Sequence, residues 1–506
     1  MNLLYPIRRA AQLFPANVAS RQDDWSITWA EMWIRVQRSA GFLTELGCAR
    51  VAVLMQNRHE YLELYYSTAL AHVWVVPLNT RWAAPDFIFA LNDSDADTIV
   101  VDECFAPLVD TLRAHCPNLR HFLYAGDGPV PEGLTAYQSG VDAAVPIINP
   151  KEPEPNEVTG LFYTSGTTGG PKAAMLTHSN LYWNSVNLAT GLAREYHGVY
   201  LHAAPMFHLA DYGATHTLTM FGSTHCYLRG FDIEALQRTI ETCRVTMVVL
   251  IPTMITMLLN HKSFGKYDLS SLRRVTYGAS PMPAPLLDEA RAKLKCSFAQ
   301  GYGMTELSPV ATILSGEDHR SRPDKLRTVG RPVTGCEVRI VDTDDNEVPR
   351  GLVGEIVARG ANRMSGYWKR PQVNADVLRG GWMHTGDAGA MDEDGYVTLY
   401  DRMKDMIKPG GENVYSPEVE SMLLSHPDIL EAAVIGVPDP KWNETIRAIV
   451  VLREQRELTE AGLIAWCRER MTHFKCPGSV VFVEALPKGG TAKVQKNVLR
   501  QQYGRA

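Results

Sequence analysis

The segment Tyr163–Lys172 contains the residue types that most clearly suggest chemistry. It reads Tyr-Thr-Ser-Gly-Thr-Thr-Gly-Gly-Pro-Lys. Glycine leaves backbone amides accessible, and amides, hydroxyls and an ammonium together suit a chain of phosphates. The spacing differs from the Walker loop, because Pro171 stands where that motif needs glycine. The candidate phosphate ligands are Thr164, Ser165, Gly166, Thr167, Thr168, Gly169 and Lys172.

Regular elements must position this loop. A strand is expected over Gly160–Tyr163, and a helix near residues 177–180, where Thr177 or Ser179 could cap. A flexible linker is the alternative interpretation, but a linker needs neither the strand nor the lysine. Apolar, β-branched runs separated by helical stretches recur at 51–54, 73–76, 98–101 and 245–251. This alternation predicts an α/β fold of doubly wound sheets.

The pattern of apolar and turn-forming residues changes after about Gly330. Short strand-like pieces, separated by Gly, Asp and Asn, predict a small β-rich subdomain; they cover 337–341, 354–358 and 395–400. After Arg402, two expected helices (417–424 and 459–472) and three expected strands (432–437, 446–452 and 480–483) predict an α+β unit. We therefore expect a large N-terminal domain, residues 1–402, and a small C-terminal domain, residues 403–506.

Composition excludes several classes of protein. The 506 residues are 45% hydrophobic and 21% charged, which is ordinary globular usage. The net charge is −6 and the sequence contains no block of basic residues, so nucleic acid is not an expected partner. Arg8 and Arg9 interrupt the apolar N-terminus, and Pro252 interrupts the longest apolar run, so neither a signal peptide nor a membrane span is expected. Nine scattered cysteines indicate buried, reduced thiols, and we expect a soluble, cytoplasmic protein.

Seven segments, in order along nearly the whole chain, resemble signatures of the adenylate-forming enzymes. This superfamily includes acyl- and aryl-CoA synthetases, luciferases and peptide-synthetase adenylation domains. The loop described above is the first segment. The others are Gly278–Ser280, Gln300–Glu306, Trp382–Asp387, Asp401–Lys404, Lys408–Asn413 and Leu486–Lys493. A single such motif is weak evidence, but seven in the family order indicate membership.

The resemblance implies a site for ATP and Mg²⁺. Carboxylate and ATP are both anions, so their reaction needs cations and oriented donors around the α-phosphate. Thr305 would donate to that phosphate, and Glu306 would bind Mg²⁺, which removes the repulsion between a carboxylate and phosphates. Asp387 and Arg402 would hold the ribose. The remaining nucleotide contacts are Gly278, Ala279, Ser280, Gly301, Tyr302 and Gly303.

The resemblance also implies a mobile C-terminal lid. Lys493, in Thr491–Val494, would bridge the acid's carboxylate and the α-phosphate as pyrophosphate leaves. Lys404 lies at the family's hinge, about which the small domain rotates between adenylation and acyl transfer.

The acyl acceptor is less clear, because Asp211 follows the Phe207-His208 pair where the family usually has apolar or small residues. A carboxylate there could hold an ammonium and accept its proton as an amine attacks acyl-AMP. The arrangement resembles amide bond synthetases of the β-carboline type. Alternatively, Asp211 pairs with His216 or Arg229 and has no catalytic role.

Around Lys408–Glu420 the chain instead resembles feruloyl- and coumaroyl-CoA synthetases, in which two glycines let the pantetheine arm of CoA pass. We favour an amine acceptor, with CoA as the alternative. His208 would gate the acceptor channel, and Phe207, Tyr212 and Met304 would contact an aromatic acid. A non-catalytic nucleotide-binding regulator is the third possibility.

Overall fold

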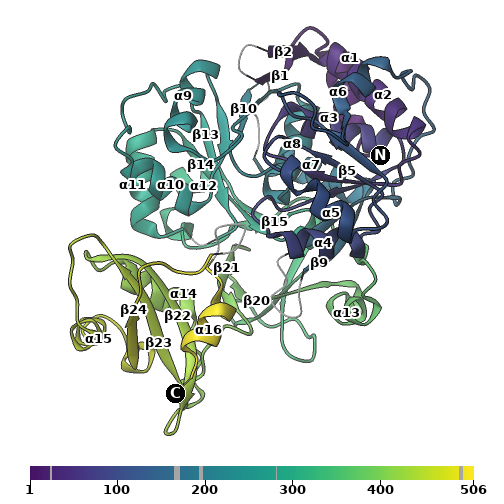
Figure 1. Ribbon diagram of the computed structural model, residues 1–506. Helices are drawn as coiled ribbons and strands as arrows, with labels where there is room; N and C mark the ends of the chain where they lie inside the picture. Colours follow the sequence, from purple (N-terminus) through teal and green to yellow (C-terminus); the bar gives the residue numbers. More distant parts are fainter. Residues whose placement is uncertain (23–24, 165–170, 193–197, 281, 489–493, 506) are drawn as a thin grey trace. The chain divides into compact units, whose positions relative to one another are not determined.

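The computed structural model describes residues 1–22, 25–164, 171–192, 198–280, 282–488 and 494–505 (Figure 1). The chain forms two compact units, Met1–Val338 with Ala358–Met383, and Arg339–Val357 with His384–Ala506. The expected α/β architecture is confirmed. The division differs from the boundary expected at residue 402, because the hairpin of β20 (Met383–Met391) and β21 (Val397–Arg402) belongs almost wholly to the second unit.

An eight-stranded sheet in the first unit has the order β19-β9-β8-β4-β3-β5-β6-β7. Its central strands are parallel, whereas β8 pairs antiparallel with β9, and β9 with β19. The strands are β3 (Arg50–Leu54), β4 (Trp74–Pro77), β5 (Thr98–Val101), β6 (His121–Tyr124), β7 (Thr135–Ala136), β8 (Val158–Thr164), β9 (Lys172–Thr177) and β19 (Gly366–Tyr367). The run at 51–54 and the two that follow it are thus strands, as predicted.

A nine-stranded sheet in the same unit has the order β16-β15-β14-β13-β12-β10-β11-β1-β2. The strands are β1 (Val18–Gln22), β2 (Trp25–Thr28), β10 (Val199–His202), β11 (Thr224–Tyr227), β12 (Met247–Val249), β13 (Arg274–Gly278), β14 (Ser297–Gly303), β15 (Val310–Leu314) and β16 (Arg331–Pro332). Strand β12 is shorter than the expected 245–251, because Pro252 opens the next helix.

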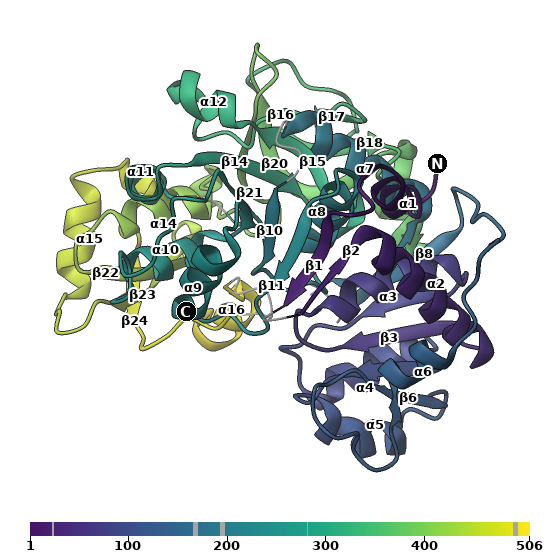
Figure 2. The same cartoon turned by 90° about the horizontal axis from the view of Figure 1, so that it is seen from above.

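Helices cover both faces of the eight-stranded sheet. Figure 2 shows α2 and α3 on one side of β3, and α4 and α5 on the other. The helices of the first unit are α1 (Tyr5–Leu13), α2 (Trp29–Glu45), α3 (His59–Leu70), α4 (Ala84–Asp93), α5 (Val109–His115), α6 (Tyr137–Ala143), α7 (His178–Gly191), α8 (Leu209–Met220), α9 (Ile233–Cys243), α10 (Pro252–Asn260), α11 (Ala284–Leu294), α12 (Gly316–Ser321) and α13 (Pro371–Val377). Thr177 caps α7, as predicted: its side chain accepts from Asn180 N, and the Asn180 side chain accepts from Thr177 N.

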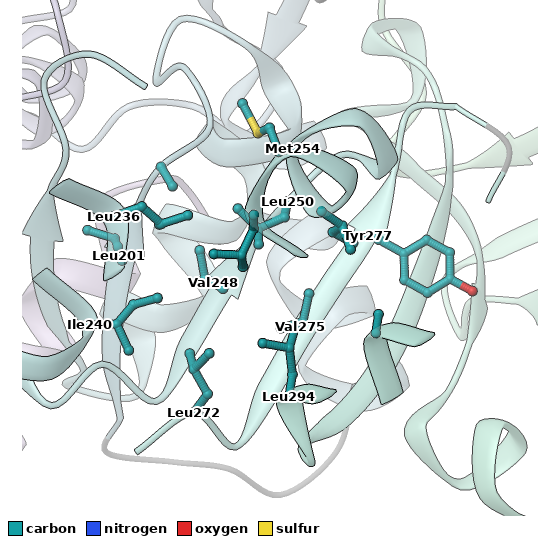
Figure 3. Packing of buried hydrophobic residues seen from close by; sticks show 14 of the residues in the cluster. Leu201, Leu236, Ile240, Val248, Leu250, Met254, Leu272, Val275, Tyr277 and Leu294 are labelled. Atoms are coloured by element: carbon teal, nitrogen blue, oxygen red, sulfur yellow. The ribbon is translucent and has the colours of Figure 1, made fainter. Parts of the chain in front are cut away.

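The core beneath the nine-stranded sheet is aliphatic. Figure 3 shows side chains of β10, β12 and β13 packed against α9, α10 and α11, with Tyr277 at the edge of the cluster. The Tyr277 ring is buried, and its hydroxyl lies 3.0 Å from Nε2 of His319. This packing holds β13 and β14 in place, and therefore the carboxyl ends of these two strands.

The second unit contains a three-stranded sheet, β22 (Ile429–Asp439), β23 (Asn443–Leu452) and β24 (Ser479–Phe482), and the helices α14 (Ser416–Leu424), α15 (Glu460–Arg468) and α16 (Lys496–Tyr503). Helix α15 ends at Arg468, four residues before the expected end. A four-stranded sheet has the order β17-β18-β20-β21, with β17 (Cys336–Val341) and β18 (Gly354–Gly360).

All nine cysteines lie within the described residues, and none of them forms a disulfide. Five are buried, Cys48, Cys243 and Cys296 are half-buried, and Cys104 is exposed, so burial is less general than we expected. Among the described residues, no helix is both long and apolar enough to cross a membrane.

Candidate active site

The described ends of the phosphate-loop segment, Thr164 and Lys172, lie on adjacent antiparallel strands, not on a strand and a helix. Thr164 ends β8 and is paired with Lys172, the first residue of β9. Thr164 Oγ1 donates to the Lys172 carbonyl over 3.3 Å. Five predicted ligands, Ser165, Gly166, Thr167, Thr168 and Gly169, lie outside the described residues. This strand pairing brings the two ends of the predicted loop together, although we had not predicted strand β9.

Lys172 and Glu306 both interact with the side chain of Tyr367. Tyr367 pairs with Ala174 across β19 and β9, and Lys172 Nζ lies 5.1 Å from the centroid of its ring. The Tyr367 hydroxyl donates to Oε1 of Glu306. The structure therefore joins two predicted phosphate-site residues through Tyr367, which our sequence analysis missed because no motif marks it.

Glu306 suits a magnesium ion that also binds phosphate oxygens. The residue lies in a short 3₁₀ turn, Thr305–Leu307, and is 4% exposed. No group of three or more His, Cys, Asp or Glu residues within the described ranges could hold a metal by itself. Mg²⁺ is commonly held by one or two carboxylates together with substrate phosphates, so a single carboxylate fits this ion.

The other predicted nucleotide segments of the first unit follow adjacent parallel strands. Gly278 ends β13 and pairs with Gly301 of β14, which ends two residues later at Gly303, so residues 279–280 and 304–306 follow the two strands at the same edge. A Cβ on Gly278 would lie 2.4 Å from the carbonyl oxygen of Gly301, and one on Gly303 would lie 1.9 Å from that of Pro309. Only glycine fits at either position. Ligands of open α/β sheets bind beyond the carboxyl ends of strands, so this edge is a suitable nucleotide site.

Several residues at this edge remain accessible. Ala279 adopts a left-handed conformation with φ of 63°, which is uncommon for alanine and is found at functional sites. Ser280, Met304 and Thr305 are half-exposed, whereas Tyr302 is buried. The accessible side chains are thus available to a ligand.

The predicted ribose ligands form an ion pair in the second unit. Asp387 of β20 lies opposite Arg402 of β21, and Arg402 Nε is 2.7 Å from Asp387 Oδ1. Arg402 also donates to the carbonyl of Thr385 over 3.2 Å. The carboxylate of Asp387 is buried, and the Arg402 side chain is 40% exposed. Lys404 is the second residue after the end of this strand.

Lys493 lies outside the described residues, and the structure describes the chain on both sides of it. Lys488 forms an isolated antiparallel bridge with Val494, and Gln495 N donates to the Pro487 carbonyl over 2.8 Å. Lys496 Nζ then pairs with Glu420 Oε1 at 2.7 Å. These contacts anchor the residues that flank the predicted catalytic lysine.

The segment with the predicted acceptor residues joins β10 to α8. His208 is the N-cap of α8, and its Nδ1 accepts from Ala210 N over 3.1 Å. His208 is half-exposed, and Phe207 is buried. Tyr212 is fully buried, and its ring packs against Tyr65 and Phe162 with centroid separations of 4.2 and 4.9 Å. Tyr212 therefore belongs to an aromatic core.

Asp211 is fully buried, and both of its oxygens have partners. Tyr200 Oη donates to Oδ1 over 2.8 Å, and His202 Nδ1 lies 2.6 Å from Oδ2. These partners differ from the two that we had considered: His216 instead bonds the Tyr66 hydroxyl, and Arg229 pairs with Glu103 and Asp127. The spacing of Asp211 from Tyr200 and His202 along the chain does not predict these hydrogen bonds.

The strand-end glycines, the carboxylate and lysine around Tyr367 and the α/β sheets are features that a nucleotide-binding enzyme requires. Comparison with known families agrees. Residues 7–368 match the AMP-binding enzyme family, and residues 418–493 match its C-terminal domain. The chain belongs to this family and is an adenylate-forming ligase.

Individual relatives match along their whole length. The chain is 39% identical to a feruloyl-CoA synthase of Amycolatopsis sp., covering 99% of this chain and 98% of that protein. It is similar to the solved o-succinylbenzoate-CoA synthetase of Bacillus subtilis with ATP and magnesium (30% identity, TM-score 0.85, 98% and 99% covered). It is also similar to the amide bond synthetase McbA of Marinactinospora thermotolerans (29% identity, TM-score 0.88, 99% and 100% covered).

Proposed function

We propose that the protein activates an aromatic carboxylic acid as acyl-AMP, with release of pyrophosphate, and transfers the acyl group to CoA. The observation that carries the choice of acceptor is the burial of Asp211, whose two carboxylate oxygens are already occupied. A general base must reach the proton that it removes. The full-length similarity to a feruloyl-CoA synthase supports the same acceptor and an aryl acid.

In this proposal the first unit holds the triphosphate. Lys172 and the hydroxyl of Thr305 bind phosphate oxygens, and the Glu306 carboxylate is oriented by its hydrogen bond from Tyr367. A magnesium ion bound to Glu306 and to the phosphates would supply positive charge at this point. The strand-end segment 278–280 contacts the base, and the glycines of β14 let the nucleotide approach the backbone.

The second unit binds the ribose and supplies the mobile lysine. Asp387 accepts from the ribose hydroxyls, because one carboxylate can accept two hydrogen bonds. Arg402 holds that carboxylate in place. Lys493 bridges the acid and the α-phosphate. Rotation about Lys404 then withdraws Lys493, so that the acceptor can attack the acyl-AMP.

The same unit offers a close backbone approach for the pantetheine arm. Gly410 and Gly411 adopt positive φ angles of 61° and 93°. Gly410 N donates to the Trp442 carbonyl over 2.9 Å, and a Cβ on Gly410 would lie 2.9 Å from the Trp442 ring. Because Gly410 has no Cβ, the loop can pack against Trp442 in the β22–β23 hairpin, and no side chain projects from the loop at this residue.

A direct experiment separates the acceptors. The protein is supplied with ferulate, ATP and Mg²⁺, and with either CoA or a simple primary amine, and products are identified by mass. We expect thioester, with amide only at the rate at which free acyl-AMP reacts with amine. Amide formation above that rate, without thioester, would favour the second candidate, an amide bond synthetase, which the similarity to McbA suggests. A parallel panel of aryl and long-chain alkyl acids, scored by pyrophosphate release, tests the acid class.

A further inference from the structure

Asp211 is one end of a chain of hydrogen bonds that is buried throughout. From its Oδ2 the chain passes to His202, whose Nε2 lies 2.9 Å from Nδ1 of His225. Nε2 of His225 then lies 3.1 Å from the hydroxyl of Thr219. Each of these four side chains has no exposed surface. A network of this kind has large energetic consequences, because any member left without a partner is unsatisfied in a low-dielectric interior.

Burial keeps the pKa of the His225 imidazole well below its ordinary value, so this ring is neutral. A neutral imidazole has one donor and one acceptor nitrogen. With Asp211 as a carboxylate, Thr219 donates to His225, His225 to His202, and His202 to Asp211. If His202 instead carries its single proton on Nε2, every bond beyond His202 is reversed, and His202 Nδ1 then needs a donor in place of the carboxylate.

The network joins α8 to the two strands beneath it. Asp211 and Thr219 lie on α8, His202 ends β10, and His225 lies on β11. Strands β10 and β11 are parallel neighbours, with Leu201 opposite Cys226. The first turn of α8 is thus tied to the end of the strand that precedes it.

The connection between β10 and α8 is also held by Asn57, which lies between β3 of the eight-stranded sheet and α3. Asn57 Nδ2 donates to the carbonyls of His202 and Ala204, over 2.8 and 2.9 Å, and Asn57 Oδ1 accepts from Met206 N over 2.8 Å. Tyr65 donates from its hydroxyl to the Met206 carbonyl. The segment that ends at His208 is therefore fixed at its start by Asn57 and at its end by Asp211.

We infer that Asp211 and His202 are positioning residues, which hold His208 at the start of α8, and that Asp211 is not a general base. Asp211 N and Tyr212 N both donate to the His208 carbonyl over 3.0 Å, so the Asp211 side chain fixes the turn that carries His208. This inference rests on the proposed role of His208 at the acceptor channel. A displacement of about 1 Å in a positioned group can cost about a hundredfold in rate.

The variants Asp211→Asn and Asp211→Ala distinguish positioning from base catalysis. In D211N the amide oxygen still accepts from Tyr200, and the amide NH₂ can donate to His202 Nδ1 once the proton of His202 moves to Nε2. The reversed arrangement then satisfies His225 and Thr219. D211A leaves Tyr200 and His202 without their partner. We expect acyl transfer from preformed acyl-AMP to fall by less than about threefold in D211N and by about ten- to a hundredfold in D211A.

A double-mutant cycle tests whether Asp211 acts through His208. If it does, the losses from D211A and His208→Ala in acyl transfer are not additive, whereas independent effects add. Thr217→Val is the matched control: this buried residue also lies on α8, but its hydroxyl donates to the backbone carbonyls of Ser185 and Gly213, outside the network. We expect its effect on acyl transfer to add to that of H208A.

Three results would overturn the inference. Folded D211N could be as slow as D211A, as a general base requires; the D211A and H208A losses could simply add; or D211A could transfer at the wild-type rate. If D211A does not fold, D211N alone decides between base and positioning. If the wild-type protein makes no thioester, the proposed function fails, and the same cycle is measured on the amide that it then makes.

Discussion

Tyr367 donates its hydroxyl hydrogen bond to the carboxylate of Glu306, which lies 61 positions earlier in the chain. The same ring lies beneath the ammonium of Lys172. One aromatic side chain therefore orients both an anion and a cation of the predicted phosphate site.

Replacing Tyr367 by Phe removes the hydroxyl and leaves the ring. We expect the KM for ATP, measured at limiting Mg²⁺, to rise about ten- to a hundredfold, because a hydrogen bond to a charged group contributes about 1.5–3 kcal/mol and each 1.4 kcal/mol is about tenfold. Tyr267→Phe is the matched control, since Tyr267 donates to Glu234 on the surface near α9. An unchanged KM in Y367F would remove Tyr367 from the site.

Glu306→Gln keeps the shape of the side chain and removes its charge. We expect the rate of acid-dependent pyrophosphate release to fall by about a hundredfold or more, because the carboxylate would no longer bind the cation that neutralises the phosphates. Raising the Mg²⁺ concentration should restore part of the loss. Glu317→Gln, on the exposed face of α12, should behave as wild type; equal losses in both variants would contradict the role of Glu306.

Lys493→Ala should separate the two half-reactions. We expect acyl-AMP formation to fall by about a thousandfold, because no other cation would bridge the two anions as pyrophosphate leaves. Use of preformed acyl-AMP should stay within about threefold, since hinge rotation would withdraw this lysine before transfer. Lys488→Ala, whose ammonium pairs with Glu431, is the control. Equal losses in both half-reactions would show that Lys493 has a different role.

Lys496 and Glu420 should matter for stability of the second unit. Burial raises the pKa of the Glu420 carboxyl, and the ammonium of Lys496, 2.7 Å away, acts against this rise. Lys496→Met leaves the carboxylate without its cation, so we expect the free energy of unfolding to fall by about 1–3 kcal/mol, measured by urea denaturation. The double variant Lys496→Met/Glu420→Leu should recover most of this loss, because an apolar pair can replace a buried ion pair. No recovery would mean that the pair itself is stabilising.

His216 should make the first unit sensitive to acid. Burial lowers the pKa of its imidazole to about 3, whereas the unfolded chain takes up the proton near pH 6.5. Between these values the unfolded state binds more protons, so the stability that the neutral ring contributes is lost as the pH falls. His216→Gln should reduce the slope of stability against pH by about 1.4 kcal/mol per unit in this window. Exposed His473→Gln is the control; equal slopes in H216Q and wild type would contradict the assignment.

Local patterns determined much of the fold. The apolar runs that became β3, β4 and β5 are short and β-branched, and Thr177 stands three residues before Asn180, so strand positions and the α7 cap follow from nearest neighbours. Gly278 and Gly303 were predicted only as nucleotide contacts, from the family resemblance; the structure shows that close backbone approach excludes any other residue at both positions. The family motifs extended this reasoning to the nucleotide site.

Only the tertiary structure decided the partners of the buried polar groups. Nothing in the spacing of Asp211 pointed to His202 and Tyr200, and nothing marked Tyr367 beside Glu306. Such pairs depend on which strands become neighbours and on where helices cross them. The sequence therefore determined the chemistry that the protein carries, while packing decided which of its charged groups remain accessible to a substrate and which are enclosed.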